Sequence, residues 1–270
     1  MKLMYITNRP EVAKIAQDAG VDWIFVDMET VGKQARQGGM DTVQSKHTVA
    51  DVAAMRPHVK AGGLLVRVNP IYEGSEAEID AVIEAGADIL MLPYFKTKAE
   101  VAAFLGFVKG RCKTMLLFET PEAADLAEEI AAMDGVDECH IGLNDLHLAY
   151  GMKFMFQLLA DGTVEKLCGI FRKAGKPYGF GGIARVGGGA LPGEAVLGEH
   201  VRLGSQAVIV SRSFCNADKE TLESMEEIFS RELPKLRGCI AQWRSADEKK
   251  LEDNRRRVVR GVDAVLEKLS

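Results

Sequence analysis

Short apolar runs alternate with stretches of helical period along most of the chain. The runs occupy residues 3–6, 23–27, 64–68, 89–93, 115–119, 138–142, 177–181 and 207–211, and their length is typical of buried strands. They are continuous rather than alternating, as in parallel strands that are covered on both faces. Amphipathic stretches predict helices over 11–19, 75–85, 98–109, 121–133 and 164–174. Eight βα units in succession predict an α/β protein of the (β/α)8 TIM-barrel type, with a doubly wound open sheet as the alternative.

Local signals place the ends of several predicted helices. Pro10 suits a first helical position, and Ser75 followed by Glu78 fits a capping box. An eighth barrel helix is predicted over 221–233, where Pro234 would break it. Residues 246–269 predict a further helix with one apolar side, which a minimal barrel does not need. We therefore expect a single domain over 1–270, with the barrel at about 1–233 and an additional C-terminal helix at about 246–269 that packs on the barrel or on a neighbouring subunit.

Composition narrows the class of protein. The 270 residues are 47% hydrophobic and 27% charged, which is ordinary for a globular protein. A core of this size is stable without disulfide bonds or a structural metal. The net charge of −5 lacks the basic excess that nucleic-acid binding requires. No window approaches the roughly 18 apolar residues of a membrane span, the N-terminus does not resemble a signal peptide, and the five cysteines form no CxxC pair. These features predict a cytoplasmic protein that binds small molecules and neither nucleic acid nor membrane.

Two apolar runs end in carboxylates. Glu119 ends the run 115–119, and Asp145 follows the run 138–142. If these runs are neighbouring parallel strands, about 4.8 Å apart, both side chains emerge at one edge of the sheet and could hold one hard divalent cation. A helix N-cap is an equally good explanation for Asp145 alone, whereas Glu119 requires a partner because a buried carboxylate is costly.

Other strands also end in polar residues, and in a barrel these ends build the active site. Asp27 and Glu29 lie two apart at the end of the second strand and therefore share a face. Arg67 ends the third strand, followed by Asn69. Arg67 could bind substrate, or it could be a structural ion-pair partner of Glu29 or Glu119.

Among the five histidines, His47 is the best candidate for chemistry. It ends the segment 38–47, which is long for a βα connection and has the length of an active-site lid. His140 lies within a strand and is expected to be packed, whereas His58 and His200 are expected at the surface. The glycine run 187–189 lacks a phosphate-binding fingerprint, so a flexible loop is the favoured interpretation.

Four motifs in order resemble the HpcH/HpaI aldolase and citrate lyase β-subunit family over about residues 1–215: residues 19–29 (AGVDWIFVDME), 66–69 (VRVN), 118–120 (FET) and 141–146 (IGLNDL). Its members are phosphoenolpyruvate/pyruvate-type TIM barrels that make or break carbon–carbon bonds next to a keto acid or an acyl-CoA. The resemblance implies that Glu119 and Asp145 bind Mg²⁺ or Mn²⁺ and that Arg67 holds the substrate and stabilises an enolate. It also implies a homo-oligomer, a trimer or a hexamer, and substrate binding by the backbone N–H groups of the turn Gly142, Leu143, Asn144 and Asp145.

One position departs from the family pattern. The pyruvate aldolases have a histidine after the second-strand glutamate, where this chain has Thr30. The base is therefore expected elsewhere, at His47 or at a water on the metal. Asp27 and Glu29 complete the catalytic set, one pairing with Arg67 and the other holding a metal-bound water. A Schiff-base route is disfavoured because Lys96 alone comes close to a strand end.

The expected function is that of a divalent-metal-dependent carbon–carbon lyase of the class II aldolase type. It would cleave or form a 2-keto acid, such as a 4-hydroxy-2-keto acid, through a pyruvate enolate. Two alternatives remain open: an acyl-CoA ester lyase of the citrate lyase β or malyl-CoA lyase type, and a non-catalytic binding protein on an inherited barrel.

Overall fold

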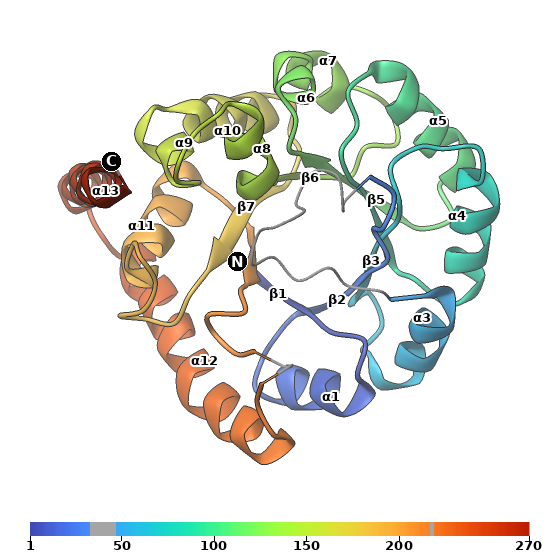
Figure 1. Cartoon of the computed structure of the whole chain (residues 1–270), viewed down its shortest axis with the longest axis horizontal. Helices are drawn as coiled ribbons and strands as arrows, with labels where there is room; N and C mark the ends of the chain where they lie inside the picture. The colour runs from blue at the N-terminus through green and yellow to red at the C-terminus, as the bar shows by residue number, and fades with distance from the viewer. Residues whose placement is uncertain (33–46, 217–218, 270) are drawn as a thin grey trace.

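The computed structural model describes residues 1–32, 47–216 and 219–269. Its centre is a closed parallel barrel in which the strands follow one another in the order β1 to β8 (Figure 1). This confirms the (β/α)8 prediction and excludes the open sheet. All eight predicted strands are present, as β1 Lys2–Ile6, β2 Trp23–Asp27, β3 Leu64–Arg67, β4 Ile89–Leu92, β5 Lys113–Phe118, β6 Glu138–Ile141, β7 Tyr178–Ile183 and β8 Ala207–Val210.

Helices surround the strands on the outside of the barrel, with α13 at the periphery beyond α11 (Figure 1). The helices predicted over 11–19, 75–85, 98–109, 164–174 and 246–269 fall within a few residues of the observed bounds, whereas α8 and α9 follow β6 without having been predicted. The helices are α1 Pro10–Asp18, α3 Val49–Met55, α4 Ser75–Glu84, α5 Lys98–Val108, α6 Pro121–Asp125, α7 Ala127–Ala131, α8 Leu143–Ala149, α9 Gln157–Ala160, α10 Thr163–Lys173, α11 Gly193–Leu203, α12 Leu222–Arg244 and α13 Glu248–Leu269, with a 3₁₀ turn at Arg56–His58.

The strands carry side chains into two separate cores, which is why their apolar runs are continuous. One face of each strand packs against the helices, and the other face fills the barrel. The side chains inside the barrel are Met4, Trp23, Phe25, Leu65, Ile89, Met91, Met115, Leu117 and Ala207. Because successive residues of a strand point to opposite faces, Asp27, Arg67 and Glu119 continue this inner set toward the carboxyl ends of their strands.

Two helix ends differ from the prediction. Ser75 is the first residue of α4, and Gly74 occupies the cap position without a side-chain hydrogen bond. The capping box is wrong because Ser75 Oγ accepts the N–H of Tyr72, while the carboxylate of Glu78 accepts hydrogen bonds from Asn69. The stretch 121–133 forms two short helices, α6 and α7, that meet at Leu126.

Pro234 does not end a helix. It lies inside α12, which continues to Arg244. A proline within a helix costs about 3 kcal/mol because it removes a hydrogen bond and crowds the preceding turn. Leu236 and Ile240 beyond it are buried on the same face as Leu233, and burying each such side chain contributes about 1.5–3 kcal/mol. Burial on both sides of the proline thus keeps α12 continuous.

The C-terminal helix α13 packs against α9 and α11 of the same chain. Its buried residues are Asn254, Val258 and Val262. Asn254 Nδ2 donates to the carbonyl of Ala195 in α11 at 2.9 Å. The predicted packing of this helix on the barrel is therefore observed. Within the described ranges, the helices are all too short or too polar to cross a membrane.

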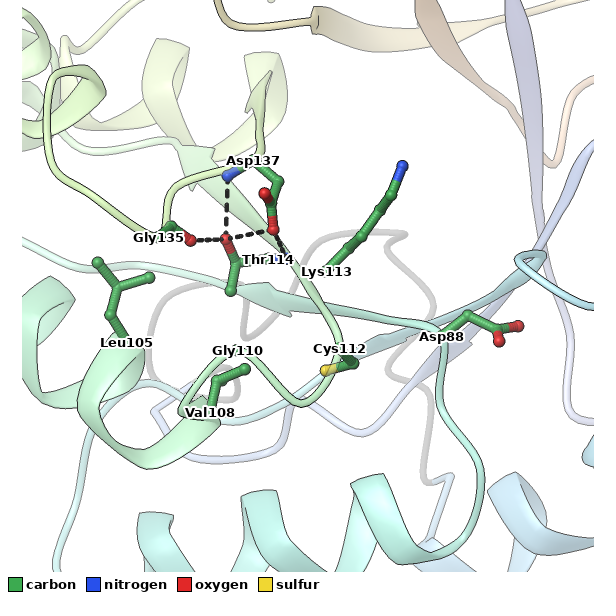
Figure 2. A pocket seen from close by; sticks show the side chains of 9 residues that line it. All are labelled: Asp88, Leu105, Val108, Gly110, Cys112, Lys113, Thr114, Gly135 and Asp137. Carbon is green, nitrogen blue, oxygen red and sulfur yellow. Dashed lines mark hydrogen bonds between the residues drawn. The ribbon is translucent and has the colours of Figure 1, made fainter.

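The amino ends of the strands form the opposite end of the barrel, where a hollow of about 480 Å³ opens beside β4–β6 (Figure 2). Thr114 and Asp137 bind one another there, since Thr114 N–H donates to Asp137 Oδ2 at 2.8 Å and Asp137 N–H donates to Thr114 Oγ1 at 3.1 Å. Burial raises the pKa of the nearby Cys112 to about 11, so its thiol is unreactive at neutral pH. These contacts stabilise the starts of two strands, which is the usual role of this end of a barrel.

Candidate active site

A cavity of about 770 Å³ opens at the carboxyl ends of the strands. The loops and strand ends around it contribute most of the residues that the sequence singled out. Of the predicted site residues, those that line it are Asp27, His47, Arg67, Glu119, Gly142, Leu143, Asn144 and Asp145. Glu29 lies beside the cavity rather than on its wall, where its side chain is 1% exposed.

Arg67 is the centre of charge on one side of this cavity. Its Nε donates to Asp27 Oδ1 at 2.8 Å and its Nη2 to Asp27 Oδ2 at 2.9 Å. Nη2 also lies 3.4 Å from Glu29 Oε2. The pairing of β2 with β3 sets Asp27 directly opposite Arg67, which produces the two-pronged contact. Burial acts to lower the pKa of Arg67, but these carboxylates raise it above its ordinary value, so the guanidinium stays charged.

Glu119 is almost completely buried, and its surroundings oppose its ionisation. Burial, followed by the carboxylates of Glu29 and Asp145, raises the pKa of Glu119 well above its ordinary value of 4.5. Arg67 and the N–H of Tyr94, which donates to Glu119 Oε1 at 3.0 Å, act in the other direction. The N–H of Tyr94 is directed at Glu119 from a left-handed backbone conformation with φ of 48°, which is strained for a residue with a side chain.

Gly142 leaves the space that the carboxylate of Glu119 occupies. A Cβ atom at position 142 would lie 2.7 Å from both Glu119 Cβ and Glu119 Oε2. No real Cβ makes such a contact, so the close approach of β5 and β6 requires glycine here. The same residue precedes α8, whose first turn carries Asp145, 8% exposed. The structure thereby brings Glu119 and Asp145 together, as the two apolar runs predict.

Asn69 fastens the chain immediately after Glu29. Its Oδ1 accepts the N–H groups of Thr30 at 2.8 Å and Val31 at 2.9 Å. Glu78 of α4 orients Asn69 by accepting its backbone N–H at 2.8 Å and its Nδ2 at 2.9 Å. Thr30 itself is exposed and bound to Asn69. Thr30 therefore belongs to the contacts that Asn69 makes, which we call the Asn69 clamp, and it is not among the residues that line the cavity.

His47 is held against the same group of charges. Its Nδ1 accepts the backbone N–H of Asp27 at 3.0 Å. A neutral imidazole that accepts at Nδ1 carries its proton on Nε2, so His47 offers an N–H donor at its second nitrogen in this arrangement. The rest of the proposed lid, including 38–46, lies outside the described residues.

The remaining candidates from the sequence lie away from the cavity or are packed. Lys96 is 46% exposed and pairs with Glu122 at 3.3 Å, which places it outside the site. His140 is fully buried within β6, as expected, and burial lowers its pKa to about 4. His200 was expected at the surface, but it is fully buried in α11, where its ring stacks on Phe180 at a centroid distance of 3.7 Å.

Several cavity residues were not anticipated. Asn8 and Arg9 follow β1, and Phe154 and Phe156 follow α8. The polar pair could have been found by the rule that identified Asp27 and Arg67, because it also follows a strand end. Nothing in the sequence indicates the left-handed conformation of Tyr94, since that is imposed by its tertiary contacts.

The residues present fit a divalent cation. Asp27, Glu29 and Glu119 act on the single guanidinium of Arg67, and Asp145 acts on Glu119, so carboxyl groups outnumber the arginine. Within the described part of the chain, no three Asp, Glu, His or Cys side chains converge as a complete metal cage. Mg²⁺ is commonly bound by only one or two carboxylates, with water and substrate oxygens completing its shell. Glu119 and Asp145 suit that type of site, and the raised pKa of Glu119 indicates that a bound positive charge would favour its ionised form.

A sequence model of the HpcH/HpaI aldolase/citrate lyase family matches residues 2–155, which is more than half of the chain. The chain belongs to this family. The matched region contains Arg67, Glu119 and the turn 142–145, whereas β7 and β8 lie beyond it. The match to the HpcH/HpaI family therefore covers β1 to β6, the part of the barrel that carries Asp27, Glu119 and Asp145.

Two curated relatives of the HpcH/HpaI member described here are aldolases by name. The 4-hydroxy-4-methyl-2-oxoglutarate aldolase of Chaetomium globosum is 24% identical over 207 residues, covering 64% of this chain and 72% of the relative. The hydroxypyruvate/pyruvate aldolase of Sagittula stellata is 26% identical over 170 residues, covering 52% of this chain and 61% of the relative.

Solved structures of the HpcH/HpaI family share the fold. A family protein from Burkholderia cenocepacia superimposes with a TM-score of 0.63 at 18% identity, covering 91% of this chain and 95% of that one. A citrate lyase from Burkholderia xenovorans superimposes with a TM-score of 0.60 at 14% identity, covering 98% and 92%. At these identities the similarity establishes the barrel alone.

Proposed function

We propose that this member of the family is a divalent-metal-dependent carbon–carbon lyase that cleaves or forms a 4-hydroxy-2-keto acid. The observation that carries the proposal is the convergence of three buried carboxyl groups, Asp27, Glu29 and Glu119, on Arg67, with a fourth, Asp145, acting on Glu119. An excess of buried carboxylates is costly unless positive charge compensates it. Both curated relatives, which are named as aldolases, support the same reaction class.

Glu119 and Asp145 would hold the cation, Mg²⁺ or Mn²⁺. When bound there, the cation would polarise the substrate's keto oxygen as a Lewis acid. Arg67 remains charged and is fixed by Asp27 and Glu29, so its positive charge is preorganised and needs no rearrangement as negative charge develops on that oxygen. Asp27 and Glu29 thus act in catalysis by orienting Arg67.

The turn 142–145 would bind the carboxylate of the keto acid. It forms the first turn of α8, and the first backbone N–H groups of a helix have no acceptor within the helix. All four of its residues line the cavity. These donors would orient the keto acid.

In the cleavage direction, the bond between C3 and C4 of the substrate breaks. The C4 hydroxyl gives its proton to a base, for which His47 or a water on the cation is the candidate, its oxygen becomes the carbonyl of the departing aldehyde, and the bonding electrons pass to the keto-acid half as an enolate. Return of that proton to C3 then yields pyruvate. Because Nδ1 of His47 is engaged by the N–H of Asp27, Nε2 is the ring nitrogen that would act on the substrate. For His47 to accept the hydroxyl proton at Nε2, it would first have to give up that contact.

The proposal predicts that pyruvate is released from 4-hydroxy-2-keto acids only when Mg²⁺ or Mn²⁺ is present. Glu119→Gln and Asp145→Asn should each reduce the metal-dependent kcat/KM by about 100-fold or more, as expected when the group that stabilises transition-state charge is lost. The assay measures pyruvate from a panel of these acids, with metal and with excess EDTA. Glu122→Gln is the matched control, because its half-exposed side chain pairs with Lys96 outside the cavity.

Three results would contradict this proposal. Full activity in Glu119→Gln or Asp145→Asn would show that the metal site is wrongly assigned. Cleavage of acyl-CoA esters, with free keto acids left intact, would move the assignment to the acyl-CoA lyase branch. Stoichiometric metal binding without either activity would indicate a binding protein.

A further inference from the structure

One side of the cavity is formed by apolar residues. All of the described lining residues between positions 154 and 196 are apolar or glycine. They belong to the segment between α8 and α9 and to the stretch from β7 to α11. We use the term apolar wall for the side chains of Phe154, Met155, Phe156, Ala190, Leu191 and Val196. The acidic lining residues lie at the ends of β2, β5 and β6 or just beyond them, so charge and apolar surface occupy different sides of the cavity.

The apolar wall has surface that a ligand can cover. Phe154 and Met155 are only partly buried, and the rings of Phe154 and Phe156 meet edge to face with centroids 5.4 Å apart. Covering such surface with an apolar group is favourable. The cavity of about 770 Å³ lies in the range of pockets that bind drug-sized ligands, and it has room for such a group beside a keto acid.

The apolar wall begins beside the turn that is proposed to bind the keto acid. Leu143 belongs to that turn and lines the cavity. Its side chain packs on β7, since a Cβ atom at Gly181 would lie 2.6 Å from Leu143 Cδ1. Carbons C1 to C3 of the substrate form the half that the turn and the cation would hold. The half that extends from C4 is therefore the one that can reach the apolar wall.

The C-terminal helix α13 lies behind both segments of the apolar wall. Helix α9 begins directly after Phe156, and α11 begins directly after Pro192. Helix α13 packs against α9 and against α11 at the periphery of the barrel (Figure 1). The family match ends at residue 155. The apolar wall is therefore supported by an element that lies beyond the matched region.

Leu191 connects α13 to the cavity. It lines the cavity with only 3% of its surface exposed, and a Cβ atom at Gly261 of α13 would lie 2.8 Å from Leu191 Cδ1. Glu194 fixes the chain around it, because Oε2 accepts the N–H of Gly187 at 2.8 Å and Oε1 lies 3.4 Å from Arg257 Nη2 of α13. Leu191 therefore has no room to withdraw from the cavity toward α13.

We propose that the apolar wall binds an apolar group on the half of the substrate that leaves as the aldehyde, and that α13 sets the depth of this pocket through the contact of Gly261 with Leu191. The inference rests on the proposed lyase function and specifies its substrate class: 4-hydroxy-2-keto acids that carry an alkyl chain or an aromatic ring beyond C4. Leu191 then determines specificity by contact with the substrate, and Gly261 does so by positioning Leu191.

The test compares 4-hydroxy-2-keto acids whose alkyl group at C4 lengthens from methyl to pentyl, together with an acid of the same length as the pentyl compound that ends in a carboxylate. For each, kcat/KM of pyruvate release is measured with Mg²⁺. We expect kcat/KM of the wild-type protein to rise about fourfold for each methylene that the apolar wall covers. The carboxylate-ended acid should be cleaved less efficiently than the pentyl acid, because its charge would lose hydration at the apolar wall.

Gly261→Ala should make the pocket shallower. The added Cβ displaces the end of the Leu191 side chain toward the cavity, so kcat/KM for the pentyl acid should fall about tenfold, while that for the methyl acid stays within about twofold of the wild-type value. Met155→Gln, which introduces a polar amide into the apolar wall, should also lower the pentyl-to-methyl ratio. The matched control is Gly238→Ala in α12, where nothing lies within 4 Å of the added Cβ. This variant should keep the wild-type ratio.

The ratio separates the pocket from a merely structural role of α13, because loss of folded protein would lower kcat/KM for both acids equally. A wild-type kcat/KM that does not rise with chain length, or that is higher for the carboxylate-ended acid, would overturn the apolar pocket while leaving the lyase function intact. An unchanged ratio in Gly261→Ala would overturn the role of α13.

If the wild-type protein releases pyruvate from none of these acids, the lyase function fails and the apolar pocket is judged by binding alone. Calorimetric titration with 2-oxooctanoate and with pyruvate, in the presence of Mg²⁺, then compares the wild-type protein with Gly261→Ala. Tighter binding of 2-oxooctanoate than of pyruvate, weakened about tenfold in the variant, would support the pocket. Equal binding of the two acids, or no binding of either, would overturn it.

Discussion

At the scale of single residues, the site depends on how closely Glu119 and its neighbours approach one another. The charges of Asp27, Glu29 and Glu119 all stabilise the Arg67 guanidinium. Asp27 accepts two short hydrogen bonds from it. Glu119 is left with a raised pKa in surroundings that disfavour its charge. A buried group of this kind is costly to stability but useful for binding a cation.

The pKa of Glu119 makes the stability of the metal-free protein depend on pH. An acid whose pKa is raised by folding stabilises the native state fully below its unfolded pKa, near 4.5, and this contribution is lost as the pH rises toward the raised value. We expect Glu119→Gln to raise the Tm of the EDTA-treated protein at pH 7, because the variant has no buried acid to ionise. Calorimetry at pH 7 and pH 4.5 checks this. A Tm that falls at pH 7 would contradict the prediction.

Gly142→Ala should damage the site by displacing Glu119. The added Cβ would meet Glu119 Cβ and Oε2 at 2.7 Å, so we expect a loss of about 1–3 kcal/mol in the free energy of unfolding together with a loss of metal-dependent pyruvate release. Denaturant unfolding and the pyruvate assay measure the two effects. The control is Gly106→Ala in α5, where nothing lies within 4 Å. That variant should gain about 0.5–1 kcal/mol, and equal behaviour of the two would refute the steric argument.

At the scale of elements, α4 is connected to the catalytic end of β2 through Asn69. Glu78 on α4 orients Asn69, and Asn69 holds the backbone of Thr30 and Val31 just beyond Glu29. The helix outside the barrel therefore positions a strand end that lies next to Arg67. This role explains why Glu78 does not cap its own helix.

Asn69→Ala should reduce both activity and stability. It leaves the N–H groups of Thr30 and Val31 without their acceptor, which costs about 1–3 kcal/mol, and it frees the chain after Glu29. We expect a lower kcat for pyruvate release and a smaller loss in Glu78→Gln, whose amide oxygen can still accept one of the two hydrogen bonds. Glu76→Gln on the same helix is the control, because its exposed side chain should leave both quantities within about 0.5 kcal/mol. Wild-type kinetics in Asn69→Ala would show that the clamp does not position the site.

At the scale of the whole molecule, α13 extends the barrel on one side. Asn254 is 4% exposed, and its Nδ2 donates to Ala195 O at 2.9 Å and lies 3.3 Å from Glu199 Oε1. Glu199 is itself completely buried and also pairs with Arg202. The C-terminal helix therefore completes a polar network inside the α11–α13 contact. A trimeric or hexameric assembly stays a prediction from the family resemblance.

Asn254→Ala should destabilise the protein by about 1–3 kcal/mol, because the carbonyl of Ala195 and the carboxylate of Glu199 lose a buried donor. The control is Arg256→Ala, because Arg256 lies on the same helix with an exposed side chain. The Tm of each variant is measured by thermal unfolding. Equal Tm values for the two variants would show that α13 contributes no specific contact.

The sequence by itself determined the barrel and the chemical identity of its acidic site. Continuous apolar runs at regular spacing specify strands covered on both faces, and a polar residue directly after such a run must lie at the carboxyl end of the barrel. Glu119, Asp145, Asp27 and Arg67 were all predicted to lie at this end for that reason. These signals are local, since each depends on a few consecutive residues.

Only the tertiary structure decided which groups pair and which face the cavity. The register of β2 against β3 sets Asp27 opposite Arg67, and the close approach of Gly142 to Glu119 depends on β5 and β6 lying side by side. The continuation of α12 through Pro234 likewise depends on burial against the barrel. Such outcomes are set by contacts between segments far apart in the chain, and no local pattern of residues encodes the distance between two strands or the energy of packing across them.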